Sequence, residues 1–285
     1  MDQDESHPLS DADKANIASA FLLLAPPGEF NEVLSDVRDL LGNDDILTGA
    51  STAFSQYNKE QMTPVNIQDF HLPVLITEYN DLGGGRFGDP RYRQSFNFDH
   101  IRKEASEVKP WEPYTSKEAL RSAVEAEVTE YCNQHYAKGA SLTISKKAYE
   151  GQIIICCIEA HDYQPHNSCN GLWRSEWRLK VSEGQAEVIG VMKIQVHYFE
   201  EGNVQLVSSK DVKETITMGP EKEVARELVK VMERAEKMYQ TGVTENYQTM
   251  TDTTFKTLRR ALPVTRTKFD WNRVTSYTIG KELKG

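Results

Sequence analysis

The sequence predicts an α+β protein in which helices at both ends of the chain flank an antiparallel sheet. Three observations support this fold class. Residues 1–60 carry apolar side chains at helical spacing, residues 141–218 alternate apolar and polar side chains between hairpin turns, and residues 219–262 resume a helical period. A chain of 285 residues with 39% hydrophobic content can bury a core without disulfide bonds. We therefore expect its four cysteines to be reduced thiols in a cytosolic protein.

We expect residues 1–60 to form three short helices packed as an up-and-down bundle. Ser10 is a suitable N-cap for the first helix, which a Pro-Pro-Gly sequence ends, and Gly42 ends the second. The third is expected from about Asp44 to Tyr57. Twelve acids against three cations make this part of the chain acidic.

The second segment, residues 61–140, gives a mixed prediction. β-branched and aromatic residues between 64 and 81 indicate strand, prolines in 86–115 indicate irregular chain, and a helix is expected from about Ser116 to His135. Within this segment "GGGRFG" has the glycine spacing of a dinucleotide-binding loop. No βαβ unit surrounds it, so we expect a flexible turn.

Residues 141–218 predict a meander of about five antiparallel strands. Such a meander has exposed edges, which are open to pairing with a partner chain. The longest helix is expected to begin at Gly219-Pro220 and to end before Pro263, which would make it about 60 Å long. Residues 263–285 then follow as a separate C-terminal tail.

The sequence gives no support for an enzyme. His161, His166 and Cys169 have spacings that match no common zinc site, and Glu176 is explained as an outward-facing strand residue. We find no nucleophile elbow and no zinc-protease motif. No metal and no other cofactor is expected.

The charge of the C-terminal end is the clearest functional signal. Residues 255–285 contain eight cations and two acids, so they carry +6 while the rest of the chain carries −16. Leucine, phenylalanine and tryptophan side chains alternate with the cations. Such a segment suits an acidic protein groove, an anionic lipid surface or a calmodulin-type receptor. The acidic remainder would repel nucleic acid. The chain has no apolar run long enough to span a membrane and no signal-peptide pattern at its start.

Several stretches resemble the α subunit of F-actin capping protein, the CapZ family. "VHYFEEGNV" at 196–204 and "FKTLRRALPV" at 255–264 are similar to its two signature segments, and "LLAPPGEFNEVLSDVR", "TENYQTMTDTTF" and "WNRVTSYTIGKE" resemble it as well. The resemblance covers nearly the whole chain. It implies an obligate heterodimer with a β subunit, in which the strands of both subunits form one sheet. A long helix crosses this sheet, the N-terminal helices form a stalk, and the amphipathic C-terminal tail is mobile.

The resemblance implies that the chain binds the barbed end of the actin filament, independently of Ca²⁺, and blocks addition and loss of actin subunits. Lys256, Arg260 and Arg266 match the basic residues that the family uses, and they would bind phosphoinositides as well. The full set of expected actin-binding residues is Lys256, Arg259, Arg260, Leu262, Arg266, Lys268 and Trp271.

Further partners follow from the same resemblance: myotrophin, CARMIL-type proteins with capping-interaction motifs, and twinfilin. The expected location is the cytoplasmic actin cytoskeleton at filament ends, including the Z-disc if the source is muscle. The alternative is a phosphoinositide-binding adaptor at the membrane surface that uses the same basic tail.

Overall fold

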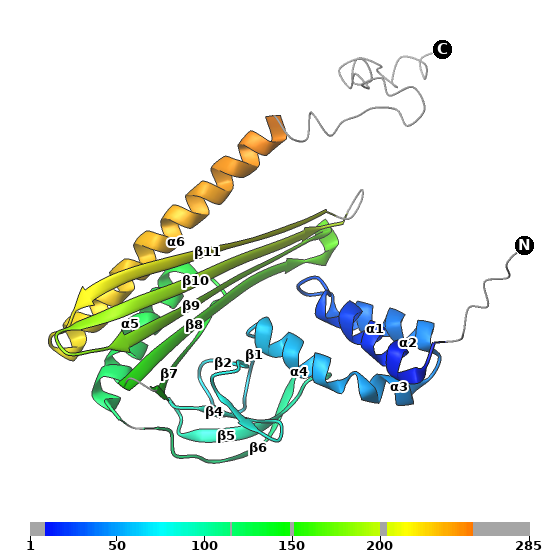
Figure 1. Cartoon of the computed structure of the whole chain (residues 1–285), viewed down its shortest axis with the longest axis horizontal. Coiled ribbons are helices and arrows are strands. Elements are labelled where there is room, and N and C mark those ends of the chain that lie inside the picture. Colours follow the sequence, from blue (N-terminus) through cyan, green and yellow to red (C-terminus); the bar gives the residue numbers. More distant parts are fainter. Residues whose placement is uncertain (1–8, 115, 149–150, 200–203, 253–285) are drawn as a thin grey trace, which may run out of the picture. The chain divides into compact units, whose positions relative to one another are not determined.

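The computed structural model describes residues 9–114, 116–148, 151–199 and 204–252. The chain divides into two compact units, Met1–Glu233 and Arg234–Gly285, and the division falls within the last helix. Figure 1 shows the elements in sequence colours. The α+β class predicted from the sequence is confirmed, because the first unit combines helices with antiparallel sheets.

The chain begins with four helices, where three were expected: α1 (Asp11–Leu23), α2 (Phe30–Leu41), α3 (Asp44–Gly49) and α4 (Ser51–Glu60). Ser10 caps α1 as predicted, since its hydroxyl accepts a hydrogen bond from the backbone N–H of Asp13. The expected third helix is divided at Ala50, where Gly49 allows a close approach to α1. A Cβ at Gly49 would lie 3.2 Å from that of Ala15. The buried side chains of the four helices form one apolar core.

A small region of short strands follows, namely β1 (Pro64–Val65), β2 (Val74–Leu75), β3 (Asp81–Gly83), β4 (Arg86–Asp89), β5 (Gln94–Asp99) and β6 (Glu104–Pro110). The first two pair with each other, and the other four form an antiparallel sheet in the order β3-β4-β5-β6. The expectation of irregular chain over 86–115 is therefore wrong for its first part. The prolines fall at strand ends, and Phe87, Phe96 and Phe98 form a buried core. Gly83, Gly84 and Gly85 have positive φ angles; Gly83 ends β3, and Gly84 and Gly85 form the turn to β4, so a turn is present as predicted.

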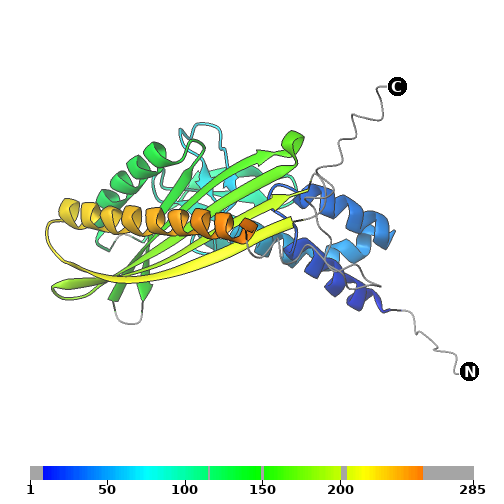
Figure 2. The same ribbon diagram turned by 90° about the horizontal axis from the view of Figure 1, so that it is seen from above.

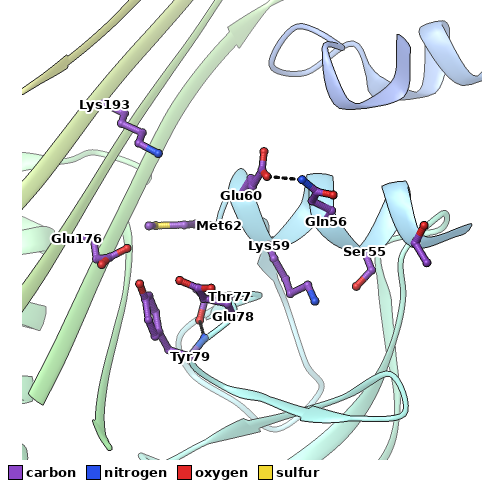
Figure 3. A pocket seen from close by; sticks show the side chains of 11 residues that line it. Ser55, Gln56, Lys59, Glu60, Met62, Thr77, Glu78, Tyr79, Glu176 and Lys193 are labelled. Carbon is purple, nitrogen blue, oxygen red and sulfur yellow. Dashed lines mark hydrogen bonds between the residues drawn. The ribbon is translucent and has the colours of Figure 1, made fainter. Parts of the chain in front are cut away.

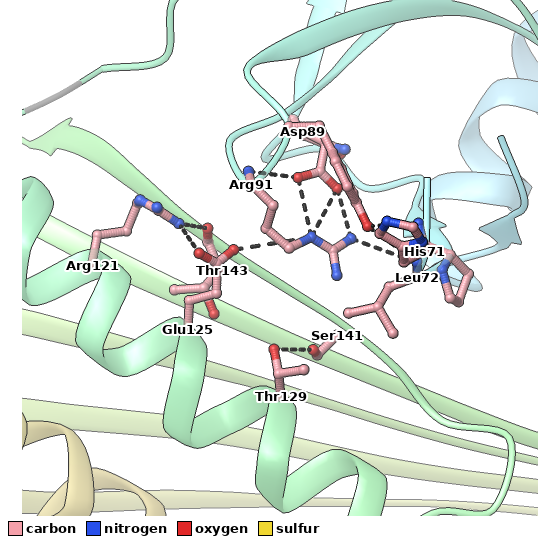
Figure 4. Close-up of polar contacts among 12 residues, drawn as sticks. His71, Leu72, Asp89, Arg91, Arg121, Glu125, Thr129, Ser141 and Thr143 are labelled. Atoms are coloured by element: carbon pink, nitrogen blue, oxygen red, sulfur yellow. Dashed lines mark hydrogen bonds and ion pairs between the residues drawn. The ribbon is translucent and has the colours of Figure 1, made fainter. Parts of the chain in front are cut away.

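Buried charges fasten this region to the next helix, α5 (Glu118–His135) (Figure 4). Asp89 is fully buried and accepts a hydrogen bond from Nη2 of Arg91 at 2.6 Å. Nε of Arg91 lies 4.0 Å from Oε1 of Glu125, whose other oxygen accepts from Arg121 at 2.9 Å. Because Arg121 also donates to the backbone oxygen of Thr143, this network connects the small sheet, α5 and the main sheet.

The main sheet is the five-stranded antiparallel meander that the sequence predicts. Its strands are β7 (Ala140–Ala148), β8 (Gly151–Gln164), β9 (Cys169–Val181), β10 (Gln185–Tyr198) and β11 (Val204–Thr217), in the spatial order β11-β10-β9-β8-β7. A single 3₁₀ turn, η1 (Pro165–Asn167), joins β8 to β9. Strands of up to 14 residues give the sheet a long, nearly unbroken register.

The two faces of the main sheet carry different layers (Figure 2). Helix α5 covers one face together with the beginning of α6, a helix that extends over Glu221–Asp252. Nε of Arg226 in α6 donates a hydrogen bond to Oε1 of Glu127 in α5 at 3.3 Å. Val224 and Leu228 of α6 are buried there. The other face packs on the region of short strands, with Leu75 in the shared core. The sheet therefore has both faces covered at the β7 end, and within the described ranges no strand pairs with the outer side of β11.

Candidate functional site

All residues predicted to bind actin lie outside the described part of the chain. They are Lys256, Arg259, Arg260, Leu262, Arg266, Lys268 and Trp271. The structure follows α6 up to Asp252, three residues before the basic segment starts. The role of these residues stays a prediction.

The first signature segment is anchored by a buried histidine. His197 lies near the end of β10 with 3% of its side chain exposed, and its Nδ1 is 2.5 Å from Oε1 of Glu29. The same Glu29 oxygen accepts a hydrogen bond from Asn170 of β9 at 3.0 Å. Glu29 is the residue before α2, so this cluster fastens the helical bundle to the far end of the main sheet. A hydrogen bond to a carboxylate is strong when it is shielded from water.

Sequence reasoning missed this junction. Glu29 and His197 are 168 residues apart, and no local pattern indicates that they meet. The one available signal was the position of His197 inside the signature segment. The structure assigns that histidine a positioning role between the bundle and the sheet.

A second buried contact lies beside the first. Arg174 of β9 donates to the backbone oxygen of Glu60, the last residue of α4, and to Oε1 of Gln195. Glu159 of β8 is fully buried and lies 2.8 Å from Nδ1 of His161. Burial raises the pKa of this carboxyl group, although the hydrogen bond to His161 opposes the shift. Both helices that border the junction are thus held by polar groups of the sheet.

A cleft of about 640 Å³ opens between α4 and the main sheet (Figure 3). Glu60, Glu78 and Glu176 line it together with two lysines, Lys59 and Lys193. Nζ of Lys59 forms an ion pair with Oδ2 of Asp81 at 3.0 Å, and Oε1 of Glu176 accepts a hydrogen bond from Nε of Arg178 at 2.6 Å. Glu176 lies in β9 as expected, but its side chain is only 17% exposed and lines the cleft, so it does not face open solvent. Two of the charged side chains that line the cleft are therefore engaged in ion pairs.

The cysteine and histidine residues do not come together as a reactive site. The thiols of Cys156 and Cys157 are fully buried, and burial raises the pKa of Cys156 to about 12. A protonated, inaccessible thiol is a poor nucleophile. His161 contacts Glu159, whereas His166 lies in η1 and Cys169 begins β9. Within the described ranges, no three His, Cys, Asp or Glu side chains are grouped so that they could hold a metal ion.

β11 forms one edge of the main sheet. β11 pairs with β10 over all of its 14 residues, and no strand of the described chain pairs with its other side. Val204 and Val207 on this strand are 53% and 68% exposed. A long, regular edge with exposed valines is a pairing surface for another strand. Among the described residues, the outer side of β11 is therefore open to pairing with another strand.

Comparison with known proteins shows the family of the chain. The model of the family "F-actin capping protein alpha subunit" matches residues 18–282. F-actin-capping protein subunit alpha of Caenorhabditis elegans is 45% identical over 97% of this chain and 99% of its own length. The subunit of the same name from Dictyostelium discoideum is 38% identical over 96% of this chain and 99% of its own. The chain therefore belongs to the F-actin capping protein alpha subunit family, which is named for a structural role and not for a catalytic one.

A solved structure supports the fold independently. The homodimeric actin capping protein alpha subunit from Plasmodium berghei matches with a TM-score of 0.71, covering 81% of this chain and 91% of that chain. The sequence identity is 16%, so this likeness concerns the fold. No helix among the described residues is long and apolar enough to cross a membrane.

Proposed function

We propose that this chain is the α subunit of a heterodimeric capping protein that binds the barbed end of the actin filament, without a need for Ca²⁺. In this role it blocks both addition and loss of actin subunits. The observation that supports the proposal most strongly is the family match, which extends to residue 282 and so includes the basic tail. The membrane-adaptor alternative is not favoured, because the relatives that match along nearly the whole chain are capping protein subunits.

The β subunit is the proposed partner at the open edge of β11. Pairing there would extend the five-stranded sheet into the second subunit and would cover the exposed backbone of the edge. The helices of the bundle would then stand at one end of the joint sheet, held by the Glu29–His197 contact. An interface of this kind should bury more than about 2,000 Å², as permanent complexes do.

The basic tail is the proposed actin-binding element. Lys256, Arg260 and Arg266 would meet acidic residues of the terminal actin subunits, assisted by Arg259 and Lys268, while Leu262 and Trp271 would supply apolar contact. Charge would speed the encounter and buried contacts would slow dissociation. Three exposed ion pairs of about 0.2–1 kcal/mol each correspond to a total of roughly threefold to 150-fold in affinity.

The same cations are proposed to bind phosphoinositides. Each lysine or arginine near an anionic leaflet contributes about 1 kcal/mol, so lipid and actin would compete for Lys256, Arg260 and Arg266. Myotrophin, CARMIL-type proteins and twinfilin are the proposed protein regulators. The proposed location is the cytoplasmic actin cytoskeleton, and the Z-disc if the source is muscle.

The test is a barbed-end growth assay on the purified complex with its β subunit. Replacement of Lys256, Arg260 and Arg266 by Ala should weaken capping of seeded pyrene-actin growth by about tenfold or more. The matched control replaces Lys281 and Lys284, two cations of the tail outside the proposed set. Equal affinities of the triple variant and the wild type, with the complex intact, would remove the assigned role of these residues.

A further inference from the structure

The turn between β5 and β6 is held in place by hydrogen bonds. Oδ1 of Asp99 accepts from two backbone N–H groups of the turn at 2.9 and 3.0 Å, and its backbone oxygen accepts from the N–H of Lys103 at 2.8 Å. The side chain of Asn58, from α4, donates to the backbone oxygen of His100 at 2.9 Å. The backbone of the turn is therefore fixed against the helical bundle.

Lys103 ends this turn in a conformation that is unusual for a lysine. Its φ angle is 57°, in the left-handed region where glycine and asparagine are more common. Its Nζ lies over the ring of Phe30, the first residue of α2, at 5.6 Å from the ring centroid. Phe30 is 1% exposed, so the turn holds the amine of Lys103 against the core of the bundle.

The amine of Lys103 has no close anionic partner. Among the described residues, no hydrogen bond and no ion pair joins its Nζ to another side chain. Lysine side chains usually keep their charged group in water, whereas this one is half-buried. Desolvation lowers the pKa of Lys103, although the exposed carboxylate of Glu32 on α2 opposes the shift. The ring of Phe30 also attracts the ammonium group, but more weakly than the water that it replaces.

A lysine in such surroundings is an activated nucleophile. Only the uncharged amine attacks an electrophile, and at pH 7 about one exposed lysine in 2,500 is uncharged. The uncharged fraction rises as the pKa falls. Ile101 and Arg102, which precede Lys103 in the turn, are exposed, so a small reagent can reach this side of the turn.

We propose that Lys103 is a modification site that accepts an acyl group from an acyl thioester. The amine attacks the carbonyl carbon of the thioester, the new N–C bond forms and the C–S bond breaks. The thiol leaves with the proton that the amine gives up, so the reaction needs no other reactant. The product is an uncharged amide in place of the ammonium group over Phe30.

The modification would act on the contact between the bundle and the small sheet. An ammonium group is attracted to the face of an aromatic ring, whereas an uncharged amide lacks this attraction. Phe30 also packs on Phe54 and Tyr57 in the bundle, with ring centroids 5.9 and 4.5 Å apart. Loss of the contact with Lys103 should therefore loosen the first turn of α2, which Phe30 begins.

The test compares the reaction rates of single lysines in the purified full chain, in the assembly in which it is isolated. A trace of acetic anhydride labels the folded protein at several pH values, and mass spectrometry of its peptides gives the rate at each lysine. The reference is Lys138, an exposed lysine in the loop after α5. At pH 7 Lys103 should react about threefold or more faster than Lys138. Acetyl-CoA, a thioester, should give the same order of rates.

Two substitutions on α2 test the cause of the reactivity. Glu32→Gln removes the carboxylate that favours the charged amine, so Lys103 should react about twofold or more faster than in the wild type. Asp36→Asn neutralises another exposed acid of α2 and is the matched control, which should leave the rate unchanged.

Two substitutions of Lys103 itself test the effect on the bundle. Lys103→Gln carries an uncharged amide, as the acylated lysine does, whereas Lys103→Arg keeps the charge over Phe30. Backbone hydrogen exchange in the first turn of α2 should be faster in Lys103→Gln than in Lys103→Arg. Equal exchange in the two variants would contradict the proposed effect on α2.

Three results would overturn the assignment of the site. They are a rate at Lys103 no higher than that at Lys138, reaction of Lys103 with the anhydride but not with acetyl-CoA, and equal rates in the Glu32→Gln and Asp36→Asn proteins. The labelling does not involve actin. Its failure would therefore leave the proposed function untouched, and a failure of barbed-end capping would leave this inference untouched.

Discussion

Replacement of Asp89 by Asn should destabilise the fold strongly, because Asp89 is a fully buried carboxylate that serves a nearly buried guanidinium. Its oxygens accept from Nε of Arg91 at 3.1 Å and from Nη2 at 2.6 Å. The side chain of Asp89 is 0% exposed and that of Arg91 is 10% exposed. The variant leaves the charge of Arg91 in place and removes the charge that balances it.

The size of the effect follows from what remains around Arg91. Breaking a buried ion pair by removal of one partner costs about 3–5 kcal/mol. Arg91 keeps its hydrogen bond to the backbone oxygen of Pro73 at 2.9 Å and the more distant carboxylate of Glu125 at 4.0 Å. The amide oxygen of the introduced Asn can also accept one hydrogen bond. We therefore expect a loss of about 2–3 kcal/mol, at the lower end of the range or just below it.

The assay is urea unfolding of the assembled protein, followed by circular dichroism at one fixed protein concentration. The matched control is Glu112→Gln, because Glu112 pairs with Arg93 at a similar distance, 2.7 Å, but the two side chains are 80% and 58% exposed. An exposed pair contributes at most about 1 kcal/mol. If Asp89→Asn cost no more than Glu112→Gln, the reasoning that burial decides the value of these pairs would be wrong.

Two further predictions concern the interior of the main sheet. Gly190→Ala should lower the free energy of unfolding by about 1–3 kcal/mol, because a Cβ there would lie 2.3 Å from the fully buried ring of Trp177. The control is Gly171→Ala, which should be close to neutral because the atom nearest to its added Cβ is 3.8 Å away. Equal effects of the two substitutions on stability would refute the packing argument. Burial raises the pKa of Glu159, so folding favours its protonated form and the wild type should gain stability relative to Glu159→Gln as the pH falls from neutral. Melting temperatures of both proteins at neutral and mildly acidic pH check this, and parallel pH profiles would contradict it.

Much of the fold could be predicted because the main elements are long and regular. Hairpin turns and alternating apolar residues indicated the meander, and α6 continues a helical period from its start at Glu221. The short strands β4 to β6 were missed because the prolines at 90, 110 and 113 were interpreted as signs of irregular chain. The alternation of Phe96 and Phe98, which pack with Phe87, was the signal that could have revealed them.

The contacts that hold the layers together could not be predicted in the same way. Glu29 meets His197 and Arg91 meets Glu125 through the tertiary fold, and local periodicity carries no information about such pairs. The assignment of the proposed actin-binding residues depends on the sequence and on the family resemblance alone, because they lie outside the described residues.

The central claim is that the assembled protein blocks filament barbed ends, and seeded growth of single actin filaments seen by fluorescence microscopy tests it most directly. We predict that the complex of this chain with its β subunit, at nanomolar concentration, stops growth at barbed ends and leaves pointed ends growing. Continued barbed-end growth at saturating, correctly assembled complex would contradict it.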